Sequence, residues 1–127
     1  MAKVTVESVQ NLRQDVRIRH HRLTGDEYPE IGGEDTAPNP HEFLLAALGN
    51  CTSMTLLVYA RRKGFPLEKV TVDLEESRDG ASTQIRRDIH LEGPLTDDQR
   101  ARLLDIASKC PVHRTITGEV RVSDRLV

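Results

Sequence analysis

An uncharged stretch between Glu42 and Arg61 constrains the fold more than any other feature of this sequence. Asn39 and Pro40 precede it as a helix N-cap and a first helical residue, and Gly64 follows it as a stop signal. Leu, Ala, Met, Val and Phe occur on every side of the predicted helix instead of along one stripe. A helix that is apolar all round is buried all round, so the sequence predicts one long core helix.

A run of this length is also long enough to cross a membrane, which takes about 18 apolar residues. The polar centre of the run, from Gly49 to Thr55, argues against a membrane span, as do the charged remainder of the chain and the lack of a basic-then-apolar leader. We therefore expect a soluble core helix and no membrane partner. A chain of 127 residues has too little mass to surround such a helix, so a second copy is the natural cover. This predicts a homodimer.

Length and composition indicate the number of domains and argue against two classes of protein, nucleic-acid-binding proteins and secreted disulfide-rich proteins. The length predicts a single domain over residues 1–127. A net charge of −2, with basic and acidic residues interspersed and only two Phe, two Tyr and no Trp, gives no case for nucleic-acid binding. Two cysteines are too few for a secreted scaffold held by disulfides, which favours a cytoplasmic location.

Residue periodicity supplies the other elements. Thr96 and Gln99 form a capping box that opens a second helix, which runs to Cys110 and is ended by Pro111. Alternation of apolar and polar residues predicts five strands, at residues 3–7, 16–21, 70–74, 85–91 and 119–124, with Arg87 as an exception to the alternation. Residues 10–15 form the tip of the first hairpin, and residues 25–38 are an acidic, turn-rich connection into the long helix. This order of elements describes an α+β fold with antiparallel hairpins.

Cys51, in the middle of the long helix, and Cys110, at the end of the second, are both expected to be buried or half-buried. One interpretation is that each is an ordinary core residue, since free cysteine is among the most buried types. A second is a zinc site made by Cys110, His113, Cys51 and one further histidine, His20, His21, His41 or His90. A third is a redox pair, in which one thiolate attacks an electrophile such as a peroxide and the other resolves the sulfenic acid into a disulfide.

The redox interpretation requires a cation near the attacking thiolate. A cysteine in the middle of a helix gains nothing from the helix N-terminus, so an arginine or lysine must come from elsewhere. The candidates are Arg13, Arg17, Arg19 and Arg114. Arg13 lies in the predicted hairpin tip, an exposed and mobile loop from which it has the freedom to reach inward.

The short first hairpin and the connection from Asp26 to Gly33 resemble the OsmC-like subgroup of the OsmC/Ohr family, the osmotically inducible and organic hydroperoxide resistance proteins. Three further segments resemble the family as a whole. They are the run NPHEFLLAALGNCT from Asn39 to Thr52, Tyr59–Gly64 and Lys109–Arg114, in the family's order and spacing. The resemblance implies an OsmC-like fold, in which a long central helix packs against antiparallel sheets in an intertwined homodimer.

The same resemblance implies a thiol-dependent peroxidase that reduces organic hydroperoxides in oxidative-stress defence, is recycled by a dithiol reductant and needs no metal or organic cofactor. Cys51 matches the peroxidatic cysteine and Cys110 the resolving cysteine. The family's arginine best matches Arg13, although Arg17 and Arg19 lie close by. Apolar helix residues would line a mouth that prefers organic hydroperoxides, for which we expect Leu48, Met54 and Leu57. The alternative is a protein that keeps the fold and binds a small hydrophobic ligand, or senses redox state, without turnover.

One family position departs from the pattern. The glutamate that follows Asn-Pro in Ohr-type sequences is His41 here, and Glu42 stands one residue later. Glu42 and Cys51 lie on opposite helix faces about 13 Å apart, so Glu42 should orient an arginine at Cys51 of the partner subunit. Otherwise it is a first-turn acid favoured by the helix dipole. His113 and Arg114, after the second helix, are expected to face solvent.

Overall fold

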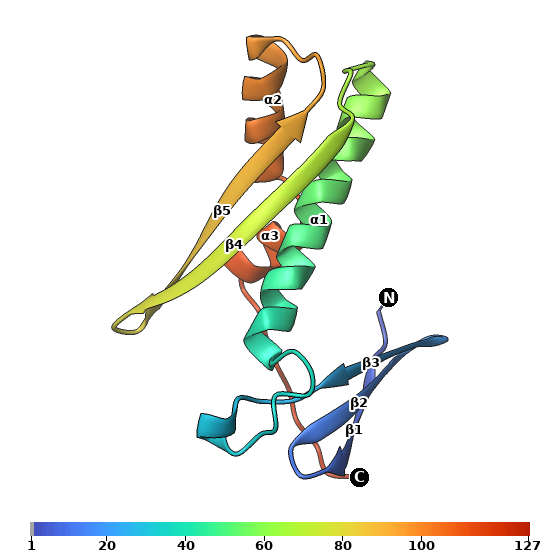
Figure 1. Ribbon diagram of the computed structural model, residues 1–127, viewed down its shortest axis with the longest axis vertical. Coiled ribbons are helices and arrows are strands. Elements are labelled where there is room, and N and C mark those ends of the chain that lie inside the picture. The colour runs from blue at the N-terminus through green and yellow to red at the C-terminus, as the bar shows by residue number, and fades with distance from the viewer. Residues whose placement is uncertain (1) are drawn as a thin grey trace. The chain divides into compact units, whose positions relative to one another are not determined.

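The computed structural model describes residues 2–127, which form strands, one long helix and several shorter helices (Figure 1). The elements are β1 (Thr5–Gln10), β2 (Arg13–Ile18), β3 (His21–Gly25), the 3-10 helix η1 (Pro29–Ile31), α1 (Pro40–Lys63), β4 (Lys69–Asp79), β5 (Ser82–Glu92), α2 (Asp97–Ala107) and α3 (Pro111–Thr117). They group into an N-terminal unit that ends at Leu44 and a C-terminal unit from Leu45 to Val127. The predicted α+β class is confirmed, and the single-domain assignment stays a prediction.

Helix α1 begins and ends where its local signals predicted. Asn39 Oδ1 accepts a hydrogen bond from the Glu42 N–H at 2.9 Å, and a Glu42 carboxylate oxygen accepts one from the Asn39 N–H at 2.8 Å. This reciprocal pair satisfies two backbone donors at the start of the helix. Gly64 follows the last helical residue with a φ of 71°, the left-handed conformation that favours glycine at a helix end.

Only one face of α1 is buried within the chain. Its buried residues recur once per turn and are Leu48, Thr52, Leu56 and Ala60. On the opposite face Met54 is 59% exposed and Val58 43% exposed. By length and composition α1 also resembles a membrane span, and 22% of its most apolar window is buried. Burial on every side, which the sequence predicted, is therefore not reached within one chain.

The N-terminal unit is a three-stranded antiparallel sheet in the order β1-β2-β3, where the sequence predicted two strands. The predicted hairpin tip over residues 10–15 is too long, because Asn11 adopts a φ of 52° and the chain turns at Asn11 and Leu12 alone. Arg13 is consequently the first residue of β2 and is half-buried, so its placement on an exposed loop is wrong. A second turn, where Arg19 has a φ of 55°, divides the predicted strand 16–21.

The C-terminal unit packs a long hairpin and α2 against one face of α1 (Figure 1). Strands β4 and β5 pair from Lys69 with Glu92 to Asp79 with Ser82, and Gly80 turns the chain with a φ of 62°. The core cluster joins α1 to α2 and consists of Leu56, Ala60, Leu103, Ile106 and Ala107. The inward-facing side chains of the hairpin, among them Val70, Ile89 and Leu91, pack against this cluster.

Two expectations for the C-terminal part need correction. Helix α2 opens with the predicted capping box but ends at Ala107, and Pro111 begins α3 instead of only ending α2, since proline suits a first helical turn. The predicted strand over residues 119–124 is wrong, because this segment is irregular and Val122 is 80% exposed. Alternation alone does not make a strand when no neighbouring edge pairs with it.

The connection between β3 and α1 is closed by the buried carboxylate of Asp26. It accepts hydrogen bonds from the backbone N–H groups of Thr36, at 3.0 Å, and of Glu27, at 2.8 Å, and from the Thr36 hydroxyl. The hydrogen bonds from Thr36, and then that from Glu27, lower the pKa of Asp26 from 3.8 to about 2, because they stabilise the charged carboxylate.

We expect Asp26 to contribute to acid resistance. A carboxylate whose pKa is lower in the folded state stabilises that state above its ordinary pKa of 3.8, and the contribution is lost as the pH falls to about 2. Urea unfolding of Asp26→Asn should therefore show lower stability at neutral pH and a shallower loss of stability over this acid range. Asp124→Asn, in the exposed tail, is the matched control. An acid dependence of Asp26→Asn equal to that of the unaltered chain would contradict this role.

Candidate functional site

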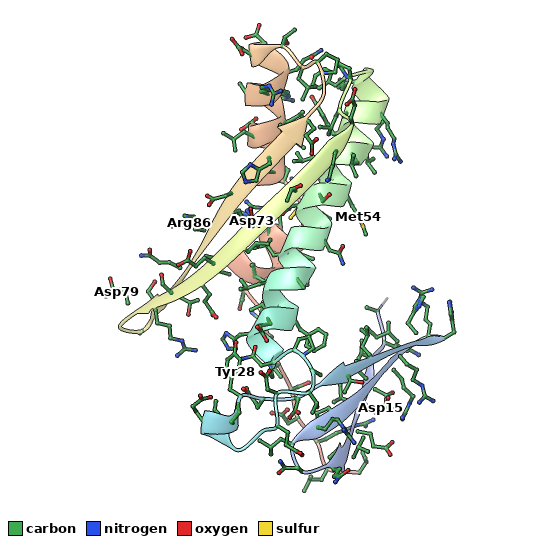
Figure 2. All side chains as sticks on the ribbon, in the orientation of Figure 1. Asp15, Tyr28, Met54, Asp73, Asp79 and Arg86 are labelled. Atoms are coloured by element: carbon green, nitrogen blue, oxygen red, sulfur yellow. The ribbon has the colours of Figure 1, made fainter. Side chains whose placement is uncertain are left out.

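Cys51 is half-buried in α1 and faces an open groove with a volume of about 610 Å³. One wall is a single face of α1, made of Ala47, Asn50, Cys51, Met54, Thr55, Val58, Tyr59 and Arg62. Ile106, Lys109 and Pro111 form the other wall. Of the predicted mouth residues, Met54 lines this groove, on the side of α1 turned away from the β4–β5 hairpin (Figure 2). Leu48 is instead buried, and Leu57 is not among the lining residues.

Cys110 lies in the link between α2 and α3 and is fully buried. Its Sγ accepts a hydrogen bond from the His113 N–H at 3.3 Å and lies 4.0 Å from Thr52 Oγ1. Thr52 is the residue next to Cys51, and the two neighbours of Cys110 in the chain line the groove that Cys51 faces. Both cysteines therefore lie at the contact between α1 and this link, one toward the groove and one behind it.

Arg87 is a functional candidate that sequence reasoning noticed but gave no role. It occupies an inward-facing position of β5, between the apolar Ile85 and Ile89. Its Nη1 donates to Thr52 Oγ1 at 2.8 Å and to the Ala107 carbonyl at 3.2 Å. The guanidinium thus connects β5 to α1 and to the end of α2. The sequence held one indication of this role, because Arg87 occupies a position in the strand at which the alternation predicts an apolar residue.

His113 is half-buried in α3, and the prediction that it faces solvent is wrong. Its Nδ1 lies 2.9 Å from Arg87 Nη2. Because a guanidinium can only donate, Nδ1 accepts this bond, and the ring is the neutral tautomer with its proton on Nε2. The expectation failed because Pro111 starts a new helix that turns His113 toward β5. Arg114 is exposed, as predicted.

The candidate arginines other than Arg114 belong to the N-terminal unit, whereas both cysteines belong to the C-terminal unit. Arg13 Nη2 donates to Gln10 Oε1 at 3.4 Å. Arg17 forms ion pairs with Glu7 at 3.2 Å and Asp15 at 3.0 Å, and its hydrogen bonds to these carboxylates raise its pKa. Which of Arg13, Arg17 and Arg19 serves Cys51 stays a prediction.

Glu42 has two partners in its own unit. One carboxylate oxygen accepts from the Asn39 N–H, and the other accepts from the Tyr28 hydroxyl at 3.2 Å. This hydrogen bond and the negative charge of Glu42 raise the pKa of Tyr28, because a phenolate would face a carboxylate. Glu42 therefore caps α1 and ties it to the preceding connection. Its action on an arginine across a subunit interface stays a prediction.

The zinc interpretation combined both cysteines with His113 and one of the histidines His20, His21, His41 and His90. Among residues 2–127, no group of three or more His, Cys, Asp and Glu side chains is arranged to hold a metal ion. His20 and His21 stack on each other in the N-terminal unit, with ring centroids 4.0 Å apart. His90 lies on the exposed face of β5, where its Nε2 is 3.3 Å from a carboxylate oxygen of Asp73. The zinc interpretation has no support in this arrangement.

Comparison with known proteins relates the chain to a single family. The sequence model of the OsmC-like proteins matches residues 33–123. An uncharacterized protein of Haloferax volcanii is 29% identical over 98 residues, which are 74% of each chain.

Solved structures agree on the fold. An OsmC-like protein from Mycoplasma pneumoniae superposes with a TM-score of 0.79 at 20% identity, over 93% of this chain and 88% of that one. An organic hydroperoxide resistance protein from Legionella pneumophila gives a TM-score of 0.70 at 21% identity, over 93% and 90% of the two chains. The predicted fold of the single chain is thereby confirmed, whereas the intertwined homodimer stays a prediction.

Proposed function

Because this chain belongs to the OsmC-like family, we propose that it is a cysteine-based peroxidase that reduces organic hydroperoxides in oxidative-stress defence. The observation that carries the proposal is the arrangement of the two thiols. Cys51 faces an apolar groove, and the buried Cys110 packs against Thr52, the residue beside Cys51. An accessible first thiol and a protected second thiol suit oxidation followed by disulfide formation.

In the first step the Cys51 thiolate attacks the terminal oxygen of a hydroperoxide. The O–O bond breaks, an alcohol leaves after it takes up a proton, and Cys51 becomes a sulfenic acid. A cation stabilises the thiolate and the departing alkoxide, and we assign this role to Arg13, with Arg17 and Arg19 as the alternatives. Glu42 would orient that arginine at Cys51 of the partner subunit.

In the second step Cys110 attacks the sulfenic sulfur, a Cys51–Cys110 disulfide forms and water leaves. A dithiol reductant then restores both thiols by thiol–disulfide exchange, so the cycle needs no metal or organic cofactor. The exposed areas of the groove are mainly apolar, with Met54 and Val58 among its walls. Such a groove favours hydroperoxides that carry an apolar body over hydrogen peroxide.

The uncovered apolar surfaces support a homodimer as the working form. Met54 and Val58 are exposed on α1. In the N-terminal unit a second apolar hollow of about 550 Å³ lies on the sheet and is lined by residues that include Val6, Leu23 and Phe43. A second copy of the chain would remove these surfaces from water, which is favourable in proportion to their area. A cytoplasmic location is part of the same proposal.

The alternative is a binding protein that keeps the fold without turnover. The groove favours this alternative because an apolar hollow can bind a small hydrophobic ligand, and the cysteine beside it could be oxidised as a redox sensor. The two functions differ in whether a hydroperoxide consumes the thiols.

We expect one equivalent of cumene hydroperoxide to consume both thiols of the reduced chain within seconds. Cys51→Ser should abolish this loss, because Cys110 is buried and depends on Cys51 to react with the peroxide. Cys110→Ser should lose one thiol, since the Cys51 sulfenic acid then has no partner. A free-thiol count before and after the addition measures all three. Survival of both thiols in the unaltered chain would contradict the peroxidase and leave the binding function.

We also expect Val58→Lys to separate the dimer. A lysine at this position would place a charge in the predicted interface, where its desolvation is unfavourable. Sedimentation should give twice the chain mass for the unaltered protein and one chain mass for Val58→Lys. Val120→Lys, in the exposed irregular tail, is a matched substitution and should leave the dimer intact. A single-chain mass for the unaltered protein would contradict the homodimer.

A further inference from the structure

Arg87 is held by neutral partners only. Its three hydrogen bonds go to the Thr52 hydroxyl, the Ala107 carbonyl and His113 Nδ1. No ion pair within residues 2–127 includes it. A half-buried guanidinium whose charge meets no counter-charge is costly, because burial removes part of its hydration. Its positive charge is therefore available to a group that becomes negative during a reaction.

The Thr52 hydroxyl links Arg87 to Cys110. A hydroxyl has one proton to donate and two lone pairs to accept. Thr52 Oγ1 donates its proton to the Leu48 carbonyl at 2.7 Å and accepts from Arg87 at 2.8 Å. One lone pair remains, and Cys110 Sγ lies 4.0 Å away. In the resting protein the Cys110 thiol is accordingly the donor in this contact. A deprotonated Cys110 would require the Thr52 hydroxyl to turn its proton from Leu48 to the sulfur.

The charge of Arg87 lies close to Cys110. The two contacts of Thr52, at 2.8 Å and 4.0 Å, bound the separation between Arg87 Nη1 and Cys110 Sγ to less than about 7 Å. His113 adds a second connection, because its ring accepts from Arg87 while its backbone N–H donates to Cys110 Sγ. The guanidinium thus orients two groups that themselves contact the sulfur.

We propose that Arg87 is a positioning residue for the resolving thiol, which stabilises the Cys110 thiolate through Thr52 and His113. This inference rests on the proposed peroxidase cycle and assigns a role in its second step. The residues of the C-terminal unit would then supply the cation for Cys110, whereas the cation for Cys51 is proposed to come from the N-terminal unit.

The step balances without an added reactant. Cys110 first loses its thiol proton, and the thiolate then attacks the sulfur of the Cys51 sulfenic acid. The S–S bond forms as the S–O bond breaks, and the oxygen leaves with the bonding electrons as hydroxide. This hydroxide and the proton that Cys110 gave up together make one water. A cation near Cys110 favours the thiolate that starts this step, since opposite charges at short range stabilise each other.

Other titratable groups surround Cys110 and must be considered in any pH dependence. Lys109 precedes it in the chain and lines the groove, His113 faces it from α3, and Cys51 lies beyond Thr52 on α1. A chain that carries Cys51→Ser removes the second thiol, so that thiolate absorbance reports Cys110 alone. Lys109 and His113 are unchanged across the variants below, and the differences between them therefore isolate Arg87.

The first test is an ultraviolet titration of the Cys110 thiolate in the Cys51→Ser chain. Adding Arg87→Met should raise the titration midpoint by about one pH unit, because the nearby positive charge is gone. Arg87→Lys, which keeps the charge, should recover part of the shift. Arg86→Met is the matched control, because Arg86 (Figure 2) directly precedes Arg87 in β5 and its side chain is 67% exposed and paired to Glu75. The Cys51→Ser chain that also carries Arg86→Met should have the same titration midpoint as the Cys51→Ser chain alone.

A second pair of variants tests the link through Thr52. Thr52→Val keeps the side-chain shape but removes the hydroxyl, and it should raise the midpoint as Arg87→Met does. Thr52→Ser keeps the hydroxyl and should not. This pair keeps the proposal testable if Arg87→Met fails to fold.

The third measurement follows the reaction itself in chains that retain Cys51. The lifetime of the Cys51 sulfenic acid is read by trapping it with dimedone after a pulse of cumene hydroperoxide. At neutral pH its conversion to the disulfide should slow about tenfold in Arg87→Met, as the thiolate fraction falls, and should approach the rate of the unaltered chain at higher pH.

The outcomes separate the two proposals. The role of Arg87 would be overturned if adding Arg87→Met left the titration midpoint of the Cys51→Ser chain unchanged. It would also be overturned if Arg86→Met shifted the midpoint as much as Arg87→Met does. Slowing by the same factor at every pH would also overturn it, because that result indicates a displaced thiol and not a lost charge. Absence of both the sulfenic acid and the disulfide after the hydroperoxide pulse in the unaltered chain would instead reject the peroxidase, while the titration would still decide whether Arg87 stabilises the thiolate.

Discussion

The buried cluster that joins α1 to α2 is the contact on which the C-terminal unit depends. Leu56 and Leu103 are both fully buried at its centre, and the β4–β5 hairpin packs around it. Because buried residues recur every four positions along α1, this packing fixes the rotation of the helix about its own axis. Thr52 consequently points toward Cys110, and Cys51, one residue earlier, faces the groove. A different rotation of α1 would bury Cys51 or expose Cys110.

Helix α1 is apolar even on the face that its own chain leaves exposed. A soluble helix that packed only against its own chain would show one apolar stripe and one polar face. In α1 the exposed face carries Met54 and Val58 instead, and these side chains also line the groove beside Cys51. Under the proposed function, one apolar surface serves both a second subunit and an apolar substrate.

Local signals were the part of the fold that the sequence predicted best. The caps of α1 at Asn39 and Gly64, and the capping box of α2, depend on residues a few positions apart, and the structure confirms them. The errors came from features that a local pattern does not determine. The left-handed backbone of Arg19 divides one predicted strand, and the alternation after residue 118 found no edge to pair with.

In the candidate site, too, features set by neighbouring residues were predicted, and features set by contacts between distant segments were not. The burial of both cysteines followed from their places in the predicted helices, and the structure confirms it. The contact between Arg87 and His113 was missed because it joins β5 to α3, and the two residues are 26 positions apart in the sequence. The only local indication was a charged residue at an inward position of β5. Glu42 illustrates the reverse case, since the structure gives its carboxylate a capping role that its family position does not suggest.

The central claim is that Cys51 and Cys110 of one chain form a redox pair. Its most direct test is mass-spectrometric mapping of the disulfide after stoichiometric oxidation by cumene hydroperoxide, with the thiols that remain blocked before digestion. The account predicts one cross-linked pair of peptides, which contains Cys51 and Cys110 of the same chain and disappears on reduction. Oxidised protein in which Cys110 remains a free thiol, or in which Cys51 is joined to Cys51 of the partner subunit, would contradict it.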